Sequence, residues 1–164
     1  MIAFTGSRKL TAIHQPLVSL IVRRFTERYD GNIKVGVGDA SGADALVRAI
    51  APTAHVFRSA DRRPFALAIR SQEMVRAASS LVAFADRACP VGLVPGPQPF
   101  NGFGSGTWAT IAYAIHLGKP VTMFALDDVG RLPQWESGEW QADGWHHANC
   151  GEGYSWKPAQ TKLF

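Results

Sequence analysis

Glycine, small polar and arginine residues gather in four segments, and each segment could hold an anion. They are Gly6, Ser7 and Arg8; Gly38, Ser41, Gly42 and Asp44; Arg70; and Gly104, Ser105, Gly106 and Thr107. Glycine lets the backbone approach a ligand closely, and an arginine guanidinium pairs with phosphate in a forked geometry. These residues predict a binding site for a phosphorylated ligand.

The glycine-rich segment 101–106 gives the strongest signal because it leads into an amphipathic helix. Apolar side chains recur at helical spacing at Trp108, Ile111, Ala112 and Ile115. The free amides of a helix start and the positive end of its dipole both attract an anion. Ser105 or Thr107 is the expected N-cap, and capping is compatible with binding phosphate.

The segment after residue 37 has two interpretations. Ser41 is a candidate N-cap for the following helix. Asp44 falls in the first turn, where a carboxylate favours the helix dipole, and it is also a candidate contact for a ribose hydroxyl.

Short apolar strands alternate with helical patterns over the first 126 residues. The expected strands are 2–5, 33–37, 55–58, 81–85 and 121–126, and the expected helices cover 14–29, 41–50, 63–78 and the segment after the glycine-rich loop. This alternation predicts an α/β fold, a doubly wound and mostly parallel five-stranded sheet with helices on both faces. Ligands of such sheets collect at the carboxyl ends of the strands, where three of the four segments emerge.

Two segments depart from this rhythm. Residues 86–106 form a long proline-containing loop, either a lid or a disordered surface insertion. Residues 127–164 hold glycines and four tryptophans, namely Trp135, Trp140, Trp145 and Trp156. Exposing so many indoles is costly, so we expect a domain over 1–126 and an appendage over 127–164. The appendage would cover one end of the sheet, form a small β unit or build a contact with a partner subunit.

The bulk composition fits one domain of 164 residues with 46% hydrophobic residues and a formal net charge of +4. That charge suits an anionic partner, or simply a solvated, slightly basic surface. No signal-peptide pattern or membrane-spanning apolar run is visible, so we expect a cytoplasmic protein with no membrane partner. Its cysteines, Cys89 and Cys150, are then expected to be reduced.

Four short motifs together resemble the SLOG superfamily over residues 1–126, and most closely its DprA/Smf-like branch. These are the Gly-Ser-Arg loop at residues 6–8, the Gly-x-Ala-x-Gly-x-Asp element at 38–44, the Arg-x-x-x-Met element at 70–74 and the Ser-Gly-Thr-x-x-Thr loop at 105–110. The resemblance implies a Rossmann-like nucleotide-binding domain that pairs as a homodimer. The "lonely guy" phosphoribohydrolases of this superfamily carry a catalytic glutamate where this sequence has Thr110. A threonine has no carboxylate for that chemistry, so the resemblance implies binding without hydrolysis.

Three functions follow. The first is a sensor or carrier of a nucleotide, dinucleotide or ADP-ribose-like ligand, with Arg8 and Arg70 on phosphates and Asp44 on a ribose; a bound nucleotide or phosphate is the only cofactor expected. The first alternative is single-stranded DNA binding through a series of cations, Arg8, Lys9, Arg62 and Arg63. The second alternative is hydrolysis of a nucleotide N-glycosidic bond, with Asp39, Asp44 or Glu73 as a substitute carboxylate.

Other chemistry has weaker support. His146, His147 and Cys150 carry zinc-ligand atoms, but adjacent histidines point in different directions and no Cys-x-x-Cys pair exists, so no metal is predicted. Cys89 precedes Pro90 with no evident base nearby, which argues against a cysteine nucleophile. The nucleophile-elbow and Walker patterns are absent.

Overall fold

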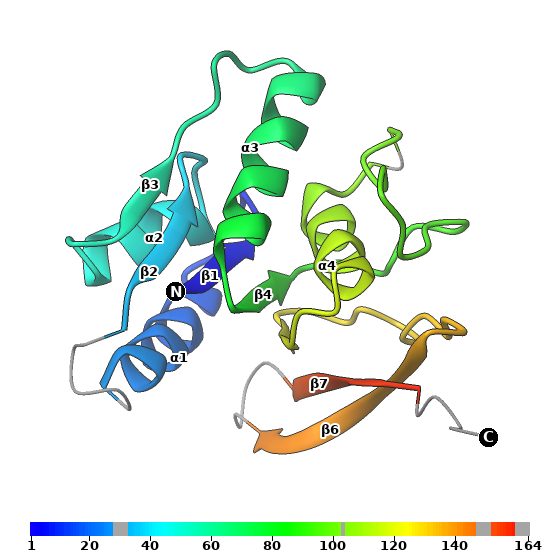
Figure 1. The fold of residues 1–164 in the computed structure, drawn as a ribbon. Coiled ribbons are helices and arrows are strands. Elements are labelled where there is room, and N and C mark those ends of the chain that lie inside the picture. The colour runs from blue at the N-terminus through cyan, green and yellow to red at the C-terminus, as the bar shows by residue number, and fades with distance from the viewer. Residues whose placement is uncertain (28–32, 103, 147–151, 160–164) are drawn as a thin grey trace.

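The computed structural model describes residues 1–27, 33–102, 104–146 and 152–159, with only the backbone at 145 and 146. Its helices are α1 (His14–Glu27), α2 (Ala43–Ile50), α3 (Pro64–Ala77) and α4 (Gly106–His116). Its strands are β1 (Ile2–Gly6), β2 (Val35–Gly38), β3 (His55–Phe57), β4 (Ser80–Ala85), β5 (Val121–Ala125), β6 (Gly138–His146) and β7 (Glu152–Pro158). Figure 1 shows how the elements follow one another along the chain.

The described strands form one sheet in the order β3-β2-β1-β4-β5-β7-β6. The first five pair in parallel, which confirms the predicted doubly wound α/β fold. The prediction of five strands was wrong, because β6 and β7 extend the sheet as an antiparallel hairpin next to β5. The chain builds outward from β1 to β3 and then returns to place β4 on the other side of β1. The switch point lies between β1 and β4, where ligands of such sheets bind.

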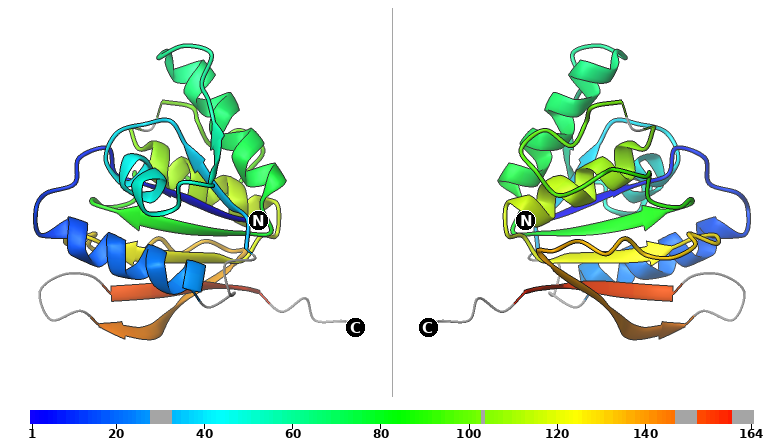
Figure 2. Two further views of the ribbon diagram at one scale, coloured as in Figure 1. Left: turned by 90° about the vertical axis from the view of Figure 1, so that its left-hand side faces the viewer. Right: turned by 90° about the vertical axis from the view of Figure 1, so that its right-hand side faces the viewer.

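Alternating side chains of the central strands reach two separate cores. Phe4 and Phe84 pack with α1 and α2, whereas Ala3 and Ala83 pack with α3 and α4. Successive side chains of a strand point to opposite faces, so a short strand supplies both cores. The two views of Figure 2 show α1 and α2 in front of one face and α4 in front of the other.

The C-terminal segment forms a β unit, one of the three arrangements that the sequence left open. Strand β7 pairs with β5 through Thr122 and Ser155, and β6 pairs in turn with β7. Four indoles meet between this hairpin and α4, with ring centroids 5.2–6.4 Å apart; this Trp cluster comprises Trp108, Trp135, Trp140 and Trp156. The side chain of Trp145 lies outside the described residues.

The helix boundaries differ from the sequence expectations by a few residues. Helix α1 is described to Glu27, and the expected end at Tyr29 falls outside the described residues. Helix α2 begins at Ala43. Within the described part of the chain, no helix combines the length and apolar character needed to cross a membrane.

Candidate functional site

A pocket of about 590 Å³ opens at the carboxyl ends of the parallel strands, over the switch point between β1 and β4. Nine of the residues predicted from the sequence line it: Gly6, Ser7, Arg8, Asp44, Arg70, Gly104, Ser105, Gly106 and Thr107. Three do not, namely Gly38, Ser41 and Gly42. The fold therefore gathers most of the predicted residues into one site, although what they bind stays a prediction.

The N-terminus of α4 forms one side of the pocket. Ser105 is the N-cap, and its Oγ accepts a hydrogen bond from the backbone N–H of Trp108 at 3.3 Å. The Thr110 hydroxyl donates to the carbonyl oxygen of Gly106 at 2.7 Å. Gly106 and Thr107 lie in the first helical turn, where backbone N–H groups have no partner within the helix. These amides are the strongest anion-attracting feature of the pocket.

The three predicted residues outside the pocket support those inside it. The prediction that Ser41 caps α2 was wrong: Gly42 is the N-cap, no side chain caps the helix, and the Ser41 hydroxyl donates to the Arg8 carbonyl oxygen at 3.2 Å. Gly42 has a φ of 69°, and a Cβ atom there would lie 2.2 Å from the Ser7 carbonyl oxygen. Glycine is required because the β1–α1 loop crosses directly over the start of α2.

Arg70 is only 6% exposed and is held by two carboxylates. Its Nη1 donates to Asp39 Oδ1 at 2.8 Å and lies 3.6 Å from Asp44 Oδ2. A Cβ atom on Gly38 would lie 2.4 Å from Asp44 Oδ2 and 2.7 Å from the Arg70 guanidinium carbon. Gly38 thus makes room for this buried ion cluster rather than facing a ligand. Arg70 borders the pocket with its charge already neutralised, and its binding of a phosphate stays a prediction.

The pKa values of the two carboxylates in this cluster are shifted in opposite directions. Burial raises the pKa of Asp44 to about 6, against the lowering influence of Arg70 and of the Ala40 N–H. Burial also raises the pKa of Asp39, but hydrogen bonds from Arg70 and from the Ser59 N–H outweigh it and leave that pKa below its usual value. Asp44 is the carboxyl whose charge changes closest to neutral pH.

Sequence reasoning missed Asp86, which follows β4 and lines the pocket. The Ser7 hydroxyl donates to Asp86 Oδ2 at 2.7 Å, and Arg87 Nη2 pairs with the same oxygen at 3.2 Å. Burial raises the pKa of Asp86, but these hydrogen bonds outweigh it and hold that pKa below its usual value. The position directly after a central parallel strand was the signal that could have identified it. The Ser7–Asp86 bond ties β1 to β4 across the switch point.

The remaining walls come from α3 and from the long loop. Pro64, Leu67 and Ala68 line the pocket from the first half of α3, and Pro99 and Phe100 line it from residues 86–106. The cations Lys9, Arg62 and Arg87 also line it. Phe103, another residue of the loop, lies outside the described part of the chain.

The described part of the chain shows neither a cluster of metal ligands nor a reactive cysteine. No group of three or more His, Cys, Asp or Glu side chains gathers among the described residues. His146, His147 and Cys150, the group of zinc-ligand residues considered from the sequence, lie outside the described side chains. Burial raises the pKa of the Cys89 thiol to about 11, so it carries little of the thiolate that a nucleophile needs at neutral pH.

Comparison with known proteins supports the fold rather than a family. The fold and site define a Rossmann-like α/β domain with its pocket at the switch point. No family model matches the sequence, and neither does any curated protein. Among solved structures, the chain is similar to DNA processing protein A (DprA) from Helicobacter pylori, a structure that was determined to explain that protein's single-stranded DNA binding mode. The TM-score is 0.55 at 14% sequence identity, over 73% of this chain and 62% of that one, less than two thirds of its length. The chain thus has a DprA-like fold.

Proposed function

We propose that this protein binds single-stranded DNA, with a backbone phosphate at the N-terminus of α4. The observation that carries the proposal is the pocket itself, in which free first-turn amides of α4 face cations from three other elements. Among the described lining residues, Arg70 and Arg87 are paired with carboxylates, and Arg8, Lys9 and Arg62 supply the excess positive charge. A positively charged groove that tracks the phosphate backbone is the usual basis of single-strand binding.

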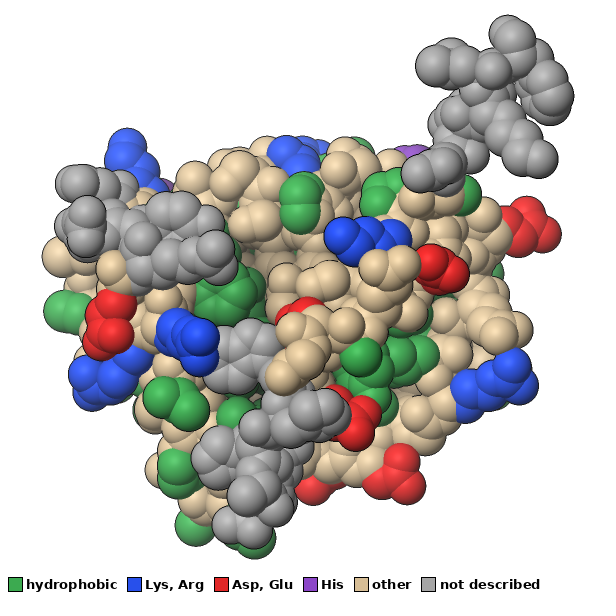
Figure 3. Space-filling model, turned by 90° about the horizontal axis from the view of Figure 1, so that it is seen from below, with side chains coloured by type: hydrophobic (Ala, Val, Ile, Leu, Met, Phe, Trp, Pro, Cys, Tyr) green, Lys and Arg blue, Asp and Glu red, His purple; other side chains and the backbone are tan. Residues whose placement is uncertain are grey.

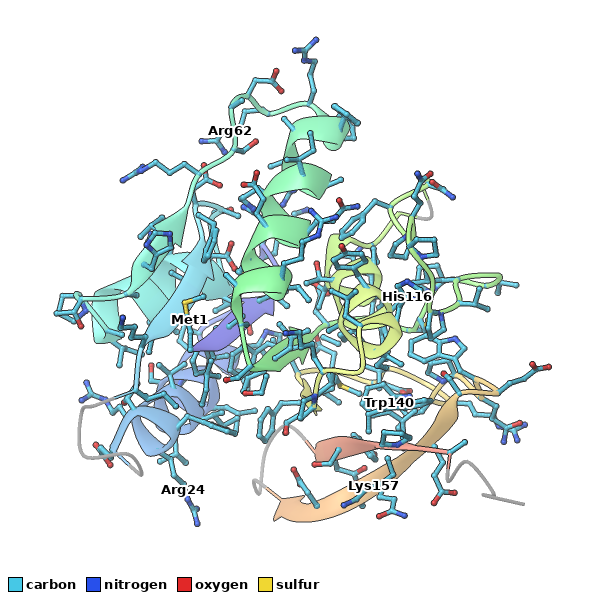
Figure 4. The ribbon with its side chains drawn as sticks, viewed as in Figure 1. Met1, Arg24, Arg62, His116, Trp140 and Lys157 are labelled. Carbon is cyan, nitrogen blue, oxygen red and sulfur yellow. The ribbon has the colours of Figure 1, made fainter. Side chains whose placement is uncertain are left out.

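Three of these cations are available to an incoming strand. Arg8, Lys9 and Arg62 are exposed, and none of them forms an ion pair with another residue that the structure describes. Phe65, on the first turn of α3, comes three residues after Arg62 in the chain and is 77% exposed. Aromatic rings beside cations provide stacking surfaces for unpaired bases. We infer that a strand leaves the pocket along the start of α3, where Figure 4 shows Arg62.

The comparison and the motifs support the same proposal. The solved DprA protein was described in terms of its single-stranded DNA binding, and this chain has the same kind of fold. Membership of the SLOG superfamily in its DprA-like branch rests on the four short motifs and is part of the proposal. The homodimer implied by the resemblance stays a prediction.

A small nucleotide is the second candidate ligand, because the pocket volume of about 590 Å³ lies within the range of small-molecule sites. Asp44 borders this volume and would contact a ribose hydroxyl. Of the three carboxylates considered for hydrolysis, Asp44 lines the pocket, whereas Asp39 and Glu73 are not among its lining residues. We assign no reaction to the protein.

Fluorescence anisotropy with a labelled oligothymidylate tests the proposal. We expect the wild-type protein to bind the single strand, a duplex of equal length to compete weakly, and thymidine monophosphate to compete at much higher concentration. The Arg62→Ala variant should bind the single strand more weakly. Competition by the mononucleotide at concentrations equal to the oligonucleotide would instead support the small-nucleotide function.

A matched control removes a cation far from the pocket. Lys157 lies on β7 at the opposite end of the molecule from Arg62 in Figure 4. The face seen from below mixes acidic and basic side chains (Figure 3). Lys157→Ala should therefore bind like the wild type. Equal losses in the Arg62 and Lys157 variants would mean that only overall charge matters, and would contradict a site in the pocket.

A further inference from the structure

The loop of residues 86–105 forms a wall of the pocket although its described residues contain no helix or strand. Arg87, Pro99 and Phe100 all face the pocket from this loop. A loop of this length lacks the backbone ladder that fixes a strand, so its position must come from other contacts.

Two indole N–H groups supply such contacts. Trp108 Nε1 donates to the carbonyl oxygen of Arg87 at 2.8 Å, and Trp135 Nε1 donates to the carbonyl oxygen of Leu93 at 2.9 Å. Leu93 is itself buried, together with Trp108 and Trp135, in the core beneath the loop. The bond to Leu93 is buried, so losing its donor would leave the Leu93 carbonyl with the full cost of its desolvation, and this bond fixes the loop at that point. The bond to Arg87 is partly buried and holds the start of the loop more weakly.

Both donors belong to the Trp cluster, which joins the loop to the C-terminal hairpin. The Trp135 ring lies 5.5 Å from that of Trp156 on β7 and 6.2 Å from that of Trp140 on β6. The Trp108 ring lies 6.4 Å from that of Trp135 and belongs to the first turn of α4. The hairpin, the loop and the anion-attracting helix start therefore share one packed group of rings.

We propose that Trp135, which packs against the rings of the C-terminal hairpin, acts as a brace: it is the positioning residue that holds the loop at the binding pocket. Neither Trp135 nor any described residue of the hairpin lines the pocket, so the brace acts through the loop. The effect on ligand binding rests on the proposed single-strand function, whereas the effect on the loop does not.

Two substitutions separate the brace from general packing. Trp135→Phe keeps an aromatic ring and removes the N–H that reaches Leu93. Trp156→Phe is the matched control, because both indoles are 6% exposed in the same core and no hydrogen bond joins Trp156 to the described residues of the loop. Amide hydrogen exchange over residues 87–100 and oligothymidylate affinity are measured on both full-length variants.

The brace predicts faster exchange over 87–100 and roughly five-fold weaker binding in Trp135→Phe, the equivalent of one lost hydrogen bond, with neither change in Trp156→Phe. Equal exchange in the two variants would overturn the brace. Faster exchange with unchanged affinity would overturn the link between loop and pocket. If the wild type binds no oligonucleotide, the proposed function fails and the exchange data still decide whether the brace exists. If Trp135→Phe does not fold, Trp108→Phe tests the same kind of bond at Arg87.

Discussion

Asp44 combines a buried position with contact to the pocket, which makes its charge relevant to any anion that enters. Its surroundings hold both signs: Arg70 lies 3.6 Å away, and Arg48 and Asp39 also influence its pKa. Burial raises that pKa to about 6, so the side chain is largely ionised at pH 7.5 and largely protonated at pH 5. An ionised Asp44 repels a phosphate in the pocket, and a protonated one does not.

Oligonucleotide affinity is therefore predicted to rise as pH falls from 7.5 to 5, with uptake of a proton at Asp44. The Asp44→Asn variant removes this titrating carboxyl and so isolates its effect. That variant should bind at pH 7.5 about as tightly as the wild type does at pH 5, and its affinity should depend less on pH. Anisotropy titrations across this range decide the matter, and identical pH profiles for the two proteins would contradict the prediction.

The same shift predicts how Asp44 affects stability. Its pKa in the folded protein lies above the ordinary value of 3.8, so the native state binds the extra proton between these two values. Its contribution to the free energy of unfolding is then present at low pH and is lost as pH rises through about 6. The disadvantage of the wild type against Asp44→Asn in denaturant midpoint should be smaller at pH 5 than at pH 7.5, because pH 5 lies between the two pKa values. A wild-type disadvantage that is the same at both pH values would contradict this.

At the scale of elements, the junction between the β1–α1 loop and α2 depends on Gly42. Both Gly42 and Gly104 have positive φ, but a Cβ atom would meet Ser7 and Arg8 backbone at Gly42 and nothing within 4 Å at Gly104. Gly104→Ala should lower the free energy of unfolding by about 1–2 kcal/mol, the strain of a left-handed residue. Gly42→Ala should cost about 1–3 kcal/mol more because of overpacking. Equal denaturation midpoints for the two variants would contradict the crowding at Gly42.

The elements also show what the sequence could predict and why. Local signals identified the five parallel strands and the pocket edge and narrowed the α4 cap to Ser105 or Thr107, because strand alternation, helix periodicity and capping depend on neighbouring residues. The contacts of Arg70 were missed because its partners, Asp39 and Asp44, come from a distant segment. Glu139, Gln141 and Asp143 on β6 show no apolar strand pattern, because an outer strand does not need two buried faces. The sequence alone therefore did not decide among the three possible arrangements of the C-terminal segment.

For the whole molecule, the hairpin bears on whether residues 1–126 fold alone. Trp135 and Trp156 are buried in the same core as α3 and α4, and β7 covers the edge of β5. Removing residues 127–164 would uncover Trp108 and leave β5 as an exposed, apolar edge strand. We predict that a 1–126 fragment aggregates or unfolds without cooperativity, as followed by circular dichroism on heating. Cooperative unfolding at the wild-type midpoint would show that the hairpin is dispensable for folding.

The salt dependence of oligothymidylate binding tests the central claim most directly, because it counts the phosphates that the pocket engages. The logarithm of affinity should fall linearly with the logarithm of salt concentration, with a slope of about −0.7 per phosphate contacted. Lys9 lines the pocket and Lys157 does not, so the same substitution at each gives a matched pair. We predict that Lys9→Ala makes the slope shallower by about 0.7 and that Lys157→Ala leaves it unchanged. An unchanged slope in Lys9→Ala, or the same loss in both variants, would contradict phosphate binding in the pocket.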